Sequence, residues 1–338
     1  MNLKKIVRSL CYFTDNVGSN WQQRLDDLAG KLQEADYQIQ TRRLCLGAYS
    51  IAEVGNVIHD DSLFVSVGSL GRAEAQSQLT DFLSAGNLHF NMDITDGVDK
   101  DDVGVLFEII KQNPSKTFNF TYTVNVPASS PYYPSAYHEK NGFAIGLQST
   151  DLSANCETVG DWLENMRTVW QDLQSLFADE TEFIGIDSSI APLDDGDSSF
   201  IAFIERVHKP FPEAVTTDIF TQISSFIKTE NPQPTGLCGL MFPCLEDAAL
   251  ARAYEQGEFS IERNIFLSLH SGLGIDTYPI AIDESPERVL EILQLLRALS
   301  LRYKKPLSAR FVSDGKSKIG ERSDFQNQYL QDVMLRKL

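Results

Sequence analysis

Short hydrophobic runs alternate with amphipathic stretches along most of this chain. The runs are rich in β-branched and aromatic residues and predict strands, whereas apolar residues at helical spacing predict helices. Regular alternation of strand and helix favours a parallel sheet covered by helices, which is the α/β class. The ten predicted strands cover residues 6–13, 38–46, 63–67, 88–93, 118–124, 143–148, 183–186, 236–242, 277–282 and 307–312.

Three predicted helices have clear sequence signals. Ser19 and Gln22 have the spacing of a capping box before an apolar helix face. Ser285 followed by Pro286 is typical of a helix start. The stretch 156–178 places its large apolar side chains on one face, namely Trp162, Met166, Val169, Leu173 and Phe177. We expect these helices to form an outer layer packed on the sheet.

The composition narrows the class of protein. Hydrophobic residues make up 42% and charged residues 22% of the 338 residues, as in globular proteins with a sizeable core. No apolar segment approaches the roughly 18 residues that a membrane helix requires, and Arg8 and Asp15 interrupt the run that a secretion signal would need. Five cysteines without paired spacing fit a reducing compartment. We therefore expect a cytoplasmic protein without a membrane partner.

The formal net charge of −18 argues against general binding to nucleic acid, because phosphate backbones would be repelled. It does not argue against a small anion in a locally basic pocket. Neither the glycine fingerprint of dinucleotide binding nor a P-loop is present. Asp194, Asp195 and Asp197 look like part of a calcium loop, but Phe200 stands where such a loop needs glycine, so a helix-capping turn is favoured. No cofactor or metal is predicted.

The most distinctive segment of the chain covers residues 235–277. The acidic residues Glu246 and Asp247 precede a predicted helix in GLMFPCLEDAALARAY. A second helix ends at HSGLGIDTYPI, which contains Ser271 and Asp276. Other distinctive fragments, in chain order, are VRSLCYF with Arg8, TRRLCL with Arg43, TVNVP with Asn125, PYYPSAYH with His138, GIDSSIAP with Asp187, and KPLSARF with Arg310.

Taken in this order, the fragments resemble the domain of unknown function 711 (DUF711) family over nearly the whole chain. The resemblance implies a distant relative of the pyruvate formate-lyase-type barrel. That fold is a ten-stranded α/β barrel of two five-stranded parallel halves set antiparallel, with helices outside, and the ten predicted strands agree with it. Many relatives have a cysteine where this chain has Ser271, so thiol chemistry cannot be carried over to that turn.

The chain is expected to form a single barrel domain, residues 1–338. Its halves would be residues 1–126 and 142–312, joined by a crossover loop at residues 127–141. That loop is rich in proline and tyrosine and is too long and aromatic to be a simple connector. The polar tail, residues 313–338, is expected to lie across the outside.

Three arginines lie inside predicted strands, where a guanidinium group needs an anion or another acceptor to offset the cost of burial. They are Arg8, Arg43 and Arg310. One interpretation is a barrel lumen that binds a carboxylate or phosphate through bidentate contacts. The alternative is internal pairing with Asp93, Asp187 or Asp276. Because three separate strands each supply one arginine, a ligand is the stronger hypothesis for the set.

The aromatic loop ends with Tyr137 and His138. A histidine beside tyrosines can act as a general acid or base near neutral pH, and Tyr137 can donate a proton or stack. The alternative for His138 is a hydrogen bond that braces the loop. The match to the family adds Asn125 and Tyr137 as candidate substrate contacts.

Four acidic residues and one serine are further candidates. Asp187 ends a strand, where α/β sheets keep their sites, although an Asx turn explains it equally well. Asp247 is predicted to cap a helix, and Glu246 remains open as a proton-transfer group. Asp276 and Ser271 lie at the turn that matches the active-site turn of the barrel family, with Ser271 a candidate nucleophile.

We therefore predict an α/β barrel whose lumen binds a small carboxylate or amino-acid-like metabolite. The arginines would hold the carboxylate, and His138 with Asp187 or Asp276 would transfer protons in a non-radical lyase, isomerase or hydrolase reaction. A glycyl radical mechanism is not expected, because the C-terminal region lacks the corresponding glycine loop and the turn lacks cysteine. The alternative is a non-catalytic sensor or binding protein. A homo-oligomer is left open.

Overall fold

The computed structural model describes residues 3–338 apart from positions 19, 48, 59 and 61. Within these residues ten strands form one mixed sheet, which confirms the α/β class. The strands are β1 Ile6–Thr14, β2 Gln38–Ile39, β3 Arg42–Leu46, β4 Phe64–Ser69, β5 Leu88–Asp93, β6 Phe120–Val124, β7 Gly142–Leu147, β8 Phe183–Asp187, β9 Gly274–Pro279 and β10 Leu307–Val312.

The strands run in two opposed directions. Their order is β8-β7-β1-β3-β4-β5-β6-β10-β9, with the short β2 paired to β1. Strands β1, β3, β4, β5 and β6 are mutually parallel. The parallel pairs β7–β8 and β10–β9 join them through antiparallel contacts at β1 and β6. The amino ends of the first set therefore lie at the same end of the sheet as the carboxyl ends of β7, β8, β9 and β10.

The predicted strand at residues 236–242 is wrong. Gly236 and Cys238 have positive φ angles of 68° and 45°, which interrupt an extended backbone. The longer stretch of residues 234–243 instead touches both edge strands through isolated parallel bridges, from Pro234 to Ile186 and from Pro243 to Asp276. The sheet consequently does not close as a continuous ladder between β8 and β9.

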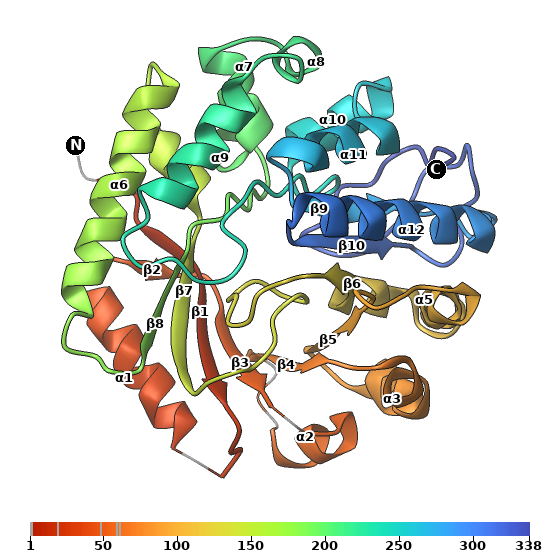
Figure 1. Cartoon of the computed structure of the whole chain (residues 1–338), viewed down its shortest axis with the longest axis horizontal. Helices are drawn as coiled ribbons and strands as arrows, with labels where there is room; N and C mark the ends of the chain where they lie inside the picture. Colours follow the sequence, from red (N-terminus) through yellow and green to blue (C-terminus); the bar gives the residue numbers. More distant parts are fainter. Residues whose placement is uncertain (1–2, 19, 48, 59, 61) are drawn as a thin grey trace.

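Helices pack around the outside of the curved sheet (Figure 1). Helix α6 follows a capping box between Thr158 and Asp161, and it buries its predicted apolar face. Helix α12 begins after Ser285, as predicted, whereas the proposed capping residue Ser19 lies outside the described residues. The helices and 3-10 turns (η) are α1 Trp21–Glu34, α2 Ile51–Val57, α3 Arg72–Ser77, α4 Leu79–Ser84, α5 Lys100–Gln112, η1 Pro114–Asn119, η2 Ser149–Ser153, α6 Val159–Leu176, η3 Gly196–Ser198, α7 Phe200–Val207, α8 Phe211–Ala214, α9 Ile219–Thr229, α10 Ala248–Gln256, α11 Ile261–His270 and α12 Pro286–Tyr303.

The loop between β6 and β7 fills much of the space that the sheet encloses (Figure 1). Its residues Tyr133 and Ala136 join a small inner core with Cys11, Phe13, Cys45 and Ala144. Polar side chains of the strands bind its backbone, since Ser9 Oγ donates to Pro131 O at 2.6 Å and Asn91 Nδ2 donates to Pro134 O at 3.1 Å. The loop thus satisfies buried polar groups of the sheet and forms the floor of the pocket described below.

The C-terminal tail does more than lie across the outside. Leu330, Val333, Leu335 and Leu338 are buried, and Gln331 N donates to Leu245 O at 2.9 Å. Packing of these apolar residues fixes the preceding Tyr329 at the pocket.

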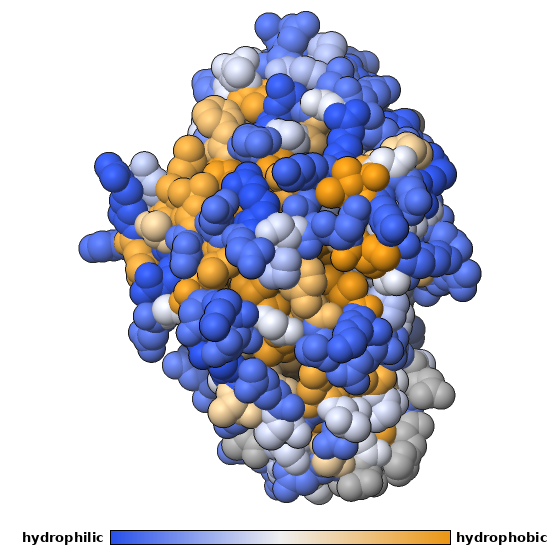
Figure 2. Space-filling model, turned by 90° about the vertical axis from the view of Figure 1, so that its right-hand side faces the viewer, coloured by the Kyte–Doolittle hydropathy of each residue, from blue (hydrophilic) through white to orange (hydrophobic). Residues whose placement is uncertain are grey.

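The face that carries α12 mixes hydrophobic and hydrophilic side chains (Figure 2). Among the described residues of α12, Leu295, Leu301 and Tyr303 are more than a third exposed. No helix in the described part of the chain has both the length and the apolar character that a membrane crossing requires.

Candidate anion-binding pocket

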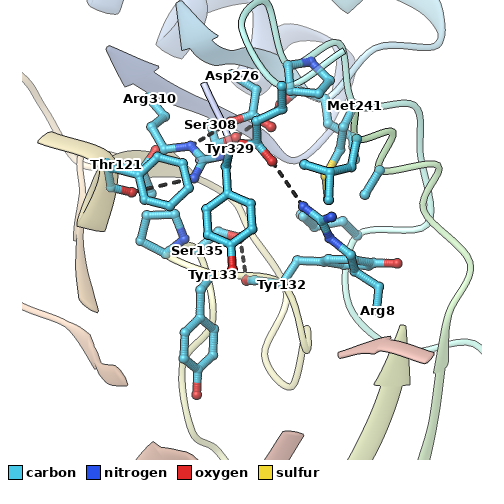
Figure 3. A pocket seen from close by; sticks show the side chains of 18 of the residues that line it. Arg8, Thr121, Tyr132, Tyr133, Ser135, Met241, Asp276, Ser308, Arg310 and Tyr329 are labelled. Carbon is cyan, nitrogen blue, oxygen red and sulfur yellow. Dashed lines mark hydrogen bonds and ion pairs between the residues drawn. The ribbon is translucent and has the colours of Figure 1, made fainter. Parts of the chain in front are cut away.

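A cavity of about 270 Å³ lies on the inner side of the sheet, where β1, β3, β4, β5 and β6 begin. Each of these strands supplies a lining residue near its first position, and the segment after β8, the residues before α10 and the tail complete the wall. Figure 3 shows Arg8 and Arg310 reaching into the pocket from opposite sides, with Tyr329 beside them. The strand-borne members are Arg8, Arg43, Phe64, His89, Thr121, Gly274, Asp276, Ser308 and Arg310.

Two arginines and two carboxylates form a continuous chain of ion pairs along one wall. Arg8 Nη2 lies 3.0 Å from Glu246 Oε2, and Arg310 Nη2 lies 2.6 Å from Glu246 Oε1. Arg310 also donates through Nε to Asp276 Oδ1 at 2.7 Å. The side chains of Arg310 and Glu246 are 8% and 5% exposed, so this pairing takes place in a region of low dielectric. Internal pairing was the alternative weighed for the strand arginines. Arg310 does pair with Asp276, one of the expected partners, whereas Arg8 pairs with Glu246, which was not among them.

The charged side chains in this row of ion pairs shift one another's pKa values. Burial raises the pKa of the Glu246 carboxyl, which Arg310 opposes and Asp276 reinforces. Burial alone would lower the pKa of the Arg310 guanidinium, but Asp276 and Glu246 outweigh it and raise that pKa. Glu246 is thus a buried carboxyl that can take up a proton more readily than an exposed one.

Arg43 has a different environment from the other two arginines. Its Nε donates to Thr41 Oγ1 at 2.9 Å and its Nη1 to Pro131 O at 3.3 Å. The guanidinium lies 5.0 Å from the ring centroid of Tyr133 and 5.6 Å from that of Phe64. It forms no ion pair with a carboxylate of the described residues, and burial followed by repulsion from Arg8 lowers its pKa to about 10. Among the described residues, Arg43 is therefore a buried cation without a carboxylate in an ion pair with it.

His89 is a pocket residue that the sequence interpretation missed. It is 3% exposed, and its Nδ1 has no hydrogen-bond partner among the described residues. Burial, then the positive charges of Arg43 and Lys116, hold its pKa well below the usual value for histidine, so the ring is neutral. A signal was available in LHFNMD, where His89 and Asn91 alternate with apolar residues and so share the inner face of β5.

Aromatic and tail residues in the pocket were also missed. Phe118 stacks on Tyr329 with centroids 6.0 Å apart and lies 4.9 Å from the Arg310 guanidinium. Tyr329 comes from the tail, whose polar composition gave no sign that it reaches the interior. Tyr132 and Tyr133 line the pocket, whereas the sequence interpretation emphasised the end of the same loop.

The structure keeps Tyr137, His138 and Asn125 out of the pocket lining. His138 Nε2 is 2.7 Å from Asn141 Oδ1, and Asn141 in turn binds Asp15. This is the loop-bracing hydrogen bond that was the alternative for His138. Tyr137 accepts a hydrogen bond from Ser129 N through its carbonyl, and Asn125 Nδ2 donates to Ser300 Oγ at 2.9 Å.

Asp187 is fully buried and lies outside the pocket lining. Its carboxylate accepts hydrogen bonds from Ser130 Oγ, from the amide and hydroxyl of Ser189, and from the amides of Leu237 and Cys238, at 2.6–3.1 Å. Burial raises its pKa against these donors. With five donors in place, the carboxylate holds the bend at residues 236–238.

Ser271 lies at the C-terminal end of α11 and is 1% exposed. Its Oγ is 2.5 Å from His270 Nδ1, and it does not line the pocket. Of the two candidate residues at this turn, Asp276 lines the cavity and Ser271 does not.

Two other sequence expectations concern acidic residues near helix starts. Asp247 is confirmed as a cap, since it accepts from Ala249 N and Leu250 N of α10 and also binds the first amides of α7. Asp195 caps the η3 turn, as expected for a capping turn. It also pairs with Arg252. The described residues contain no group of three or more His, Cys, Asp or Glu side chains that could bind a metal ion.

These features define an α/β protein with a ten-stranded mixed sheet and a buried, arginine-rich pocket on its inner side. The chain belongs to the family described as Uncharacterised ACR (DUF711), whose model matches residues 91–326, and this confirms the resemblance noted in the sequence.

Similar proteins come from three species of the genus Pyrobaculum. A UPF0210 protein of Pyrobaculum aerophilum is 25% identical over 341 residues, covering 90% of this chain and 70% of its own length. A UPF0210 protein of Pyrobaculum islandicum is 25% identical over 305 residues, covering 81% of this chain and 68% of its own. The match to a UPF0210 protein of Pyrobaculum arsenaticum, 23% identical, covers about half of that relative (51%). Their names assign no activity.

Proposed function

We propose that this protein binds a small carboxylate or amino-acid-like metabolite in the pocket and acts on it as a non-radical enzyme of the lyase, isomerase or hydrolase type. The observation that carries the proposal is Arg43, a buried guanidinium in the cavity wall without a carboxylate partner among the described residues. A buried charge is costly unless an ion of opposite sign meets it. A ligand carboxylate would supply that ion.

Glu246 is the proposed proton-transfer group. It faces the cavity between Arg8 and Arg310, and burial raises its pKa. A raised pKa is the direction in which enzymes tune a carboxyl group for proton transfer. It would accept one proton from the bound molecule, or from the attacking water in a hydrolase reaction, and return it to the product. This proton transfer changes no oxidation state and needs no oxidant. His138, Asp187 and Ser271 have no place in this version of the proposal, because they do not line the cavity.

The architecture is compatible with the barrel that the family resemblance implies. Two oppositely directed sets of parallel strands curve around the pocket, and residues 234–243 lie between β8 and β9. We propose that this segment takes the place of a regular strand in an open relative of the pyruvate formate-lyase-type barrel.

Replacing Arg43 with glutamine should weaken carboxylate binding about a hundredfold, since a charged hydrogen-bonding partner of the ligand is lost. The measurement is a thermal-shift screen of small carboxylic acids followed by calorimetric titration of the hits. A ligand at a hundred times its Kd should stabilise the wild type by about 2.7 kcal/mol. Arg252→Gln, on the exposed surface and paired with Asp195, is the matched control and should bind like the wild type. Equal affinity of the Arg43 variant and the wild type would refute the pocket as the anion site.

Glu246→Gln separates the enzyme from a non-catalytic sensor. If the protein is an enzyme, the variant should keep carboxylate binding and lose about a hundredfold or more in turnover of the identified acid, the usual contribution of a general acid or base. If the wild type binds acids but never converts them, the sensor alternative holds.

A further inference from the structure

His89 occupies an unusual position for a buried imidazole. Its ring lies 5.2 Å from the centroid of Tyr133 and 5.8 Å from that of Phe64. Arg43 packs on the same two rings, so the two side chains are neighbours in the pocket wall. Both are buried. Among the described residues, His89 Nδ1 has no hydrogen-bond partner, and Arg43 donates through Nε and Nη1 without pairing with a carboxylate.

The contacts of Asn119 fix the tautomer of His89. Asn119 Nδ2 donates to Leu88 O at 3.1 Å and lies 3.2 Å from His89 Nε2. Because the Leu88 carbonyl can only accept, the amide must present its nitrogen there, and its second hydrogen then points to Nε2. Nε2 is therefore an acceptor, and the single proton of the neutral ring is on Nδ1. The unpartnered atom is thus an N–H donor, which needs an oxygen acceptor.

The charge of the pocket favours a net anion over a zwitterion. Three arginines face two carboxylates, which leaves at least one excess positive charge. Each oxygen of Glu246 already accepts from an arginine, and Asp276 pairs with Arg310. An ammonium group near Arg43 and the His89 N–H would be repelled by the arginine charge and would face a second hydrogen-bond donor. An uncharged oxygen there could accept the hydrogen bond from the His89 N–H.

We infer that the ligand is a monoanionic carboxylic acid with an uncharged oxygen acceptor next to its carboxylate, and that His89 Nδ1–H donates to this oxygen while Arg43 binds the carboxylate. This inference rests on the proposed carboxylate function of the pocket. The inferred substrate class is therefore a hydroxy or acyl-type acid rather than an amino acid. The aromatic wall of Phe64, Phe118 and Tyr329 suits an apolar body on the ligand.

The test compares acids that share a phenyl body and differ in one group. Calorimetric titration measures 3-phenyllactate, 3-phenylpropanoate and phenylalanine against the wild type, Arg43→Gln, His89→Phe and His208→Gln. The His89→Phe substitution keeps an aromatic ring for packing but removes the N–H donor. His208 is exposed and does not line the cavity, so its variant is the matched control.

In the wild type, phenyllactate should bind about tenfold more tightly than phenylpropanoate, the usual gain from one satisfied hydrogen bond, and phenylalanine should bind most weakly. His89→Phe should abolish the difference between phenyllactate and phenylpropanoate, and His208→Gln should preserve it. Three results would overturn the inference and still leave the carboxylate site standing. They are equal wild-type affinity for phenyllactate and phenylpropanoate, a wild-type preference for phenylalanine, and a preference for phenyllactate over phenylpropanoate that survives in His89→Phe. Should His89→Phe fail to fold, the wild-type series decides alone. If no acid binds, or Arg43→Gln binds them all as the wild type does, the proposed function itself fails.

Discussion

Replacing Arg310 with methionine is expected to lower the free energy of unfolding by about 3–5 kcal/mol, the cost of leaving buried carboxylates without their cation. Arg310 bonds to Glu246 at 2.6 Å and to Asp276 at 2.7 Å, and its side chain is 8% exposed. Methionine is unbranched like arginine, although shorter, and keeps part of the packing against Phe118. The predicted loss therefore comes mainly from charge, and urea denaturation measures it.

The loss should depend on pH in a definite direction. Without Arg310, the effect of burial on the Glu246 pKa is opposed by the smaller contributions of Arg8 and Arg43, so this pKa should rise further in the folded variant than in the wild type. A carboxyl whose folded pKa exceeds its unfolded value of about 4.3 adds stability below that value and loses it as pH rises through the folded pKa. The difference in stability between wild type and variant should therefore grow as pH rises above that unfolded value.

Arg252→Met provides the matched control for Arg310. Its ion pair with Asp195 is exposed, and pairs of this kind contribute about 0–1 kcal/mol. A loss of stability in Arg310→Met no larger than in Arg252→Met, or one that shrinks with rising pH, would contradict the buried ion-pair chain.

The regular strands could be predicted because their signal is local. Residues 88–93 and 307–312 match β5 and β10 at both ends, since alternation of side chains along a strand is visible in the sequence. The predicted strand 236–242 was wrong because residues distant in the sequence determine the backbone conformation there. Asp187, about fifty residues away, binds the amides of Leu237 and Cys238 and holds a bend where hydrophobicity alone indicates a strand.

The site could be predicted only in part. The sequence shows which residues are charged, but it does not show which residues pair with one another in the fold. A strand arginine signals an anion, and the structure indeed brings Arg8, Arg43 and Arg310 to one cavity. That Glu246 would neutralise two of them, and not the third, depends on contacts across separations of 238 and 64 residues. His138 and Asp187 were attractive as loop and strand-end residues, yet neighbouring donors and acceptors occupy their polar atoms.

The bend at residues 236–238 leads to the second large expected effect. Gly236→Ala should lower the free energy of unfolding by at least about 3 kcal/mol, through steric conflict and backbone strain together. A Cβ at this position would lie 2.2 Å from Asp187 Oδ2 and 2.8 Å from Ser130 Cα. Asp187 cannot easily move away, since five donors hold its carboxylate. In addition, the φ of 68° is unfavourable for alanine by about 1 kcal/mol.

Gly104→Ala is the control for Gly236→Ala, because it makes the same chemical change without the conflict. Gly104 lies inside α5, and a Cβ there would meet no atom within 4 Å. Alanine should stabilise the helix by up to about 1 kcal/mol. Thermal and urea unfolding of both variants give the comparison. If Gly236→Ala were as stable as Gly104→Ala, Asp187 could not be packed against Gly236, and its role would have to be sought in chemistry rather than in holding the segment between β8 and β9.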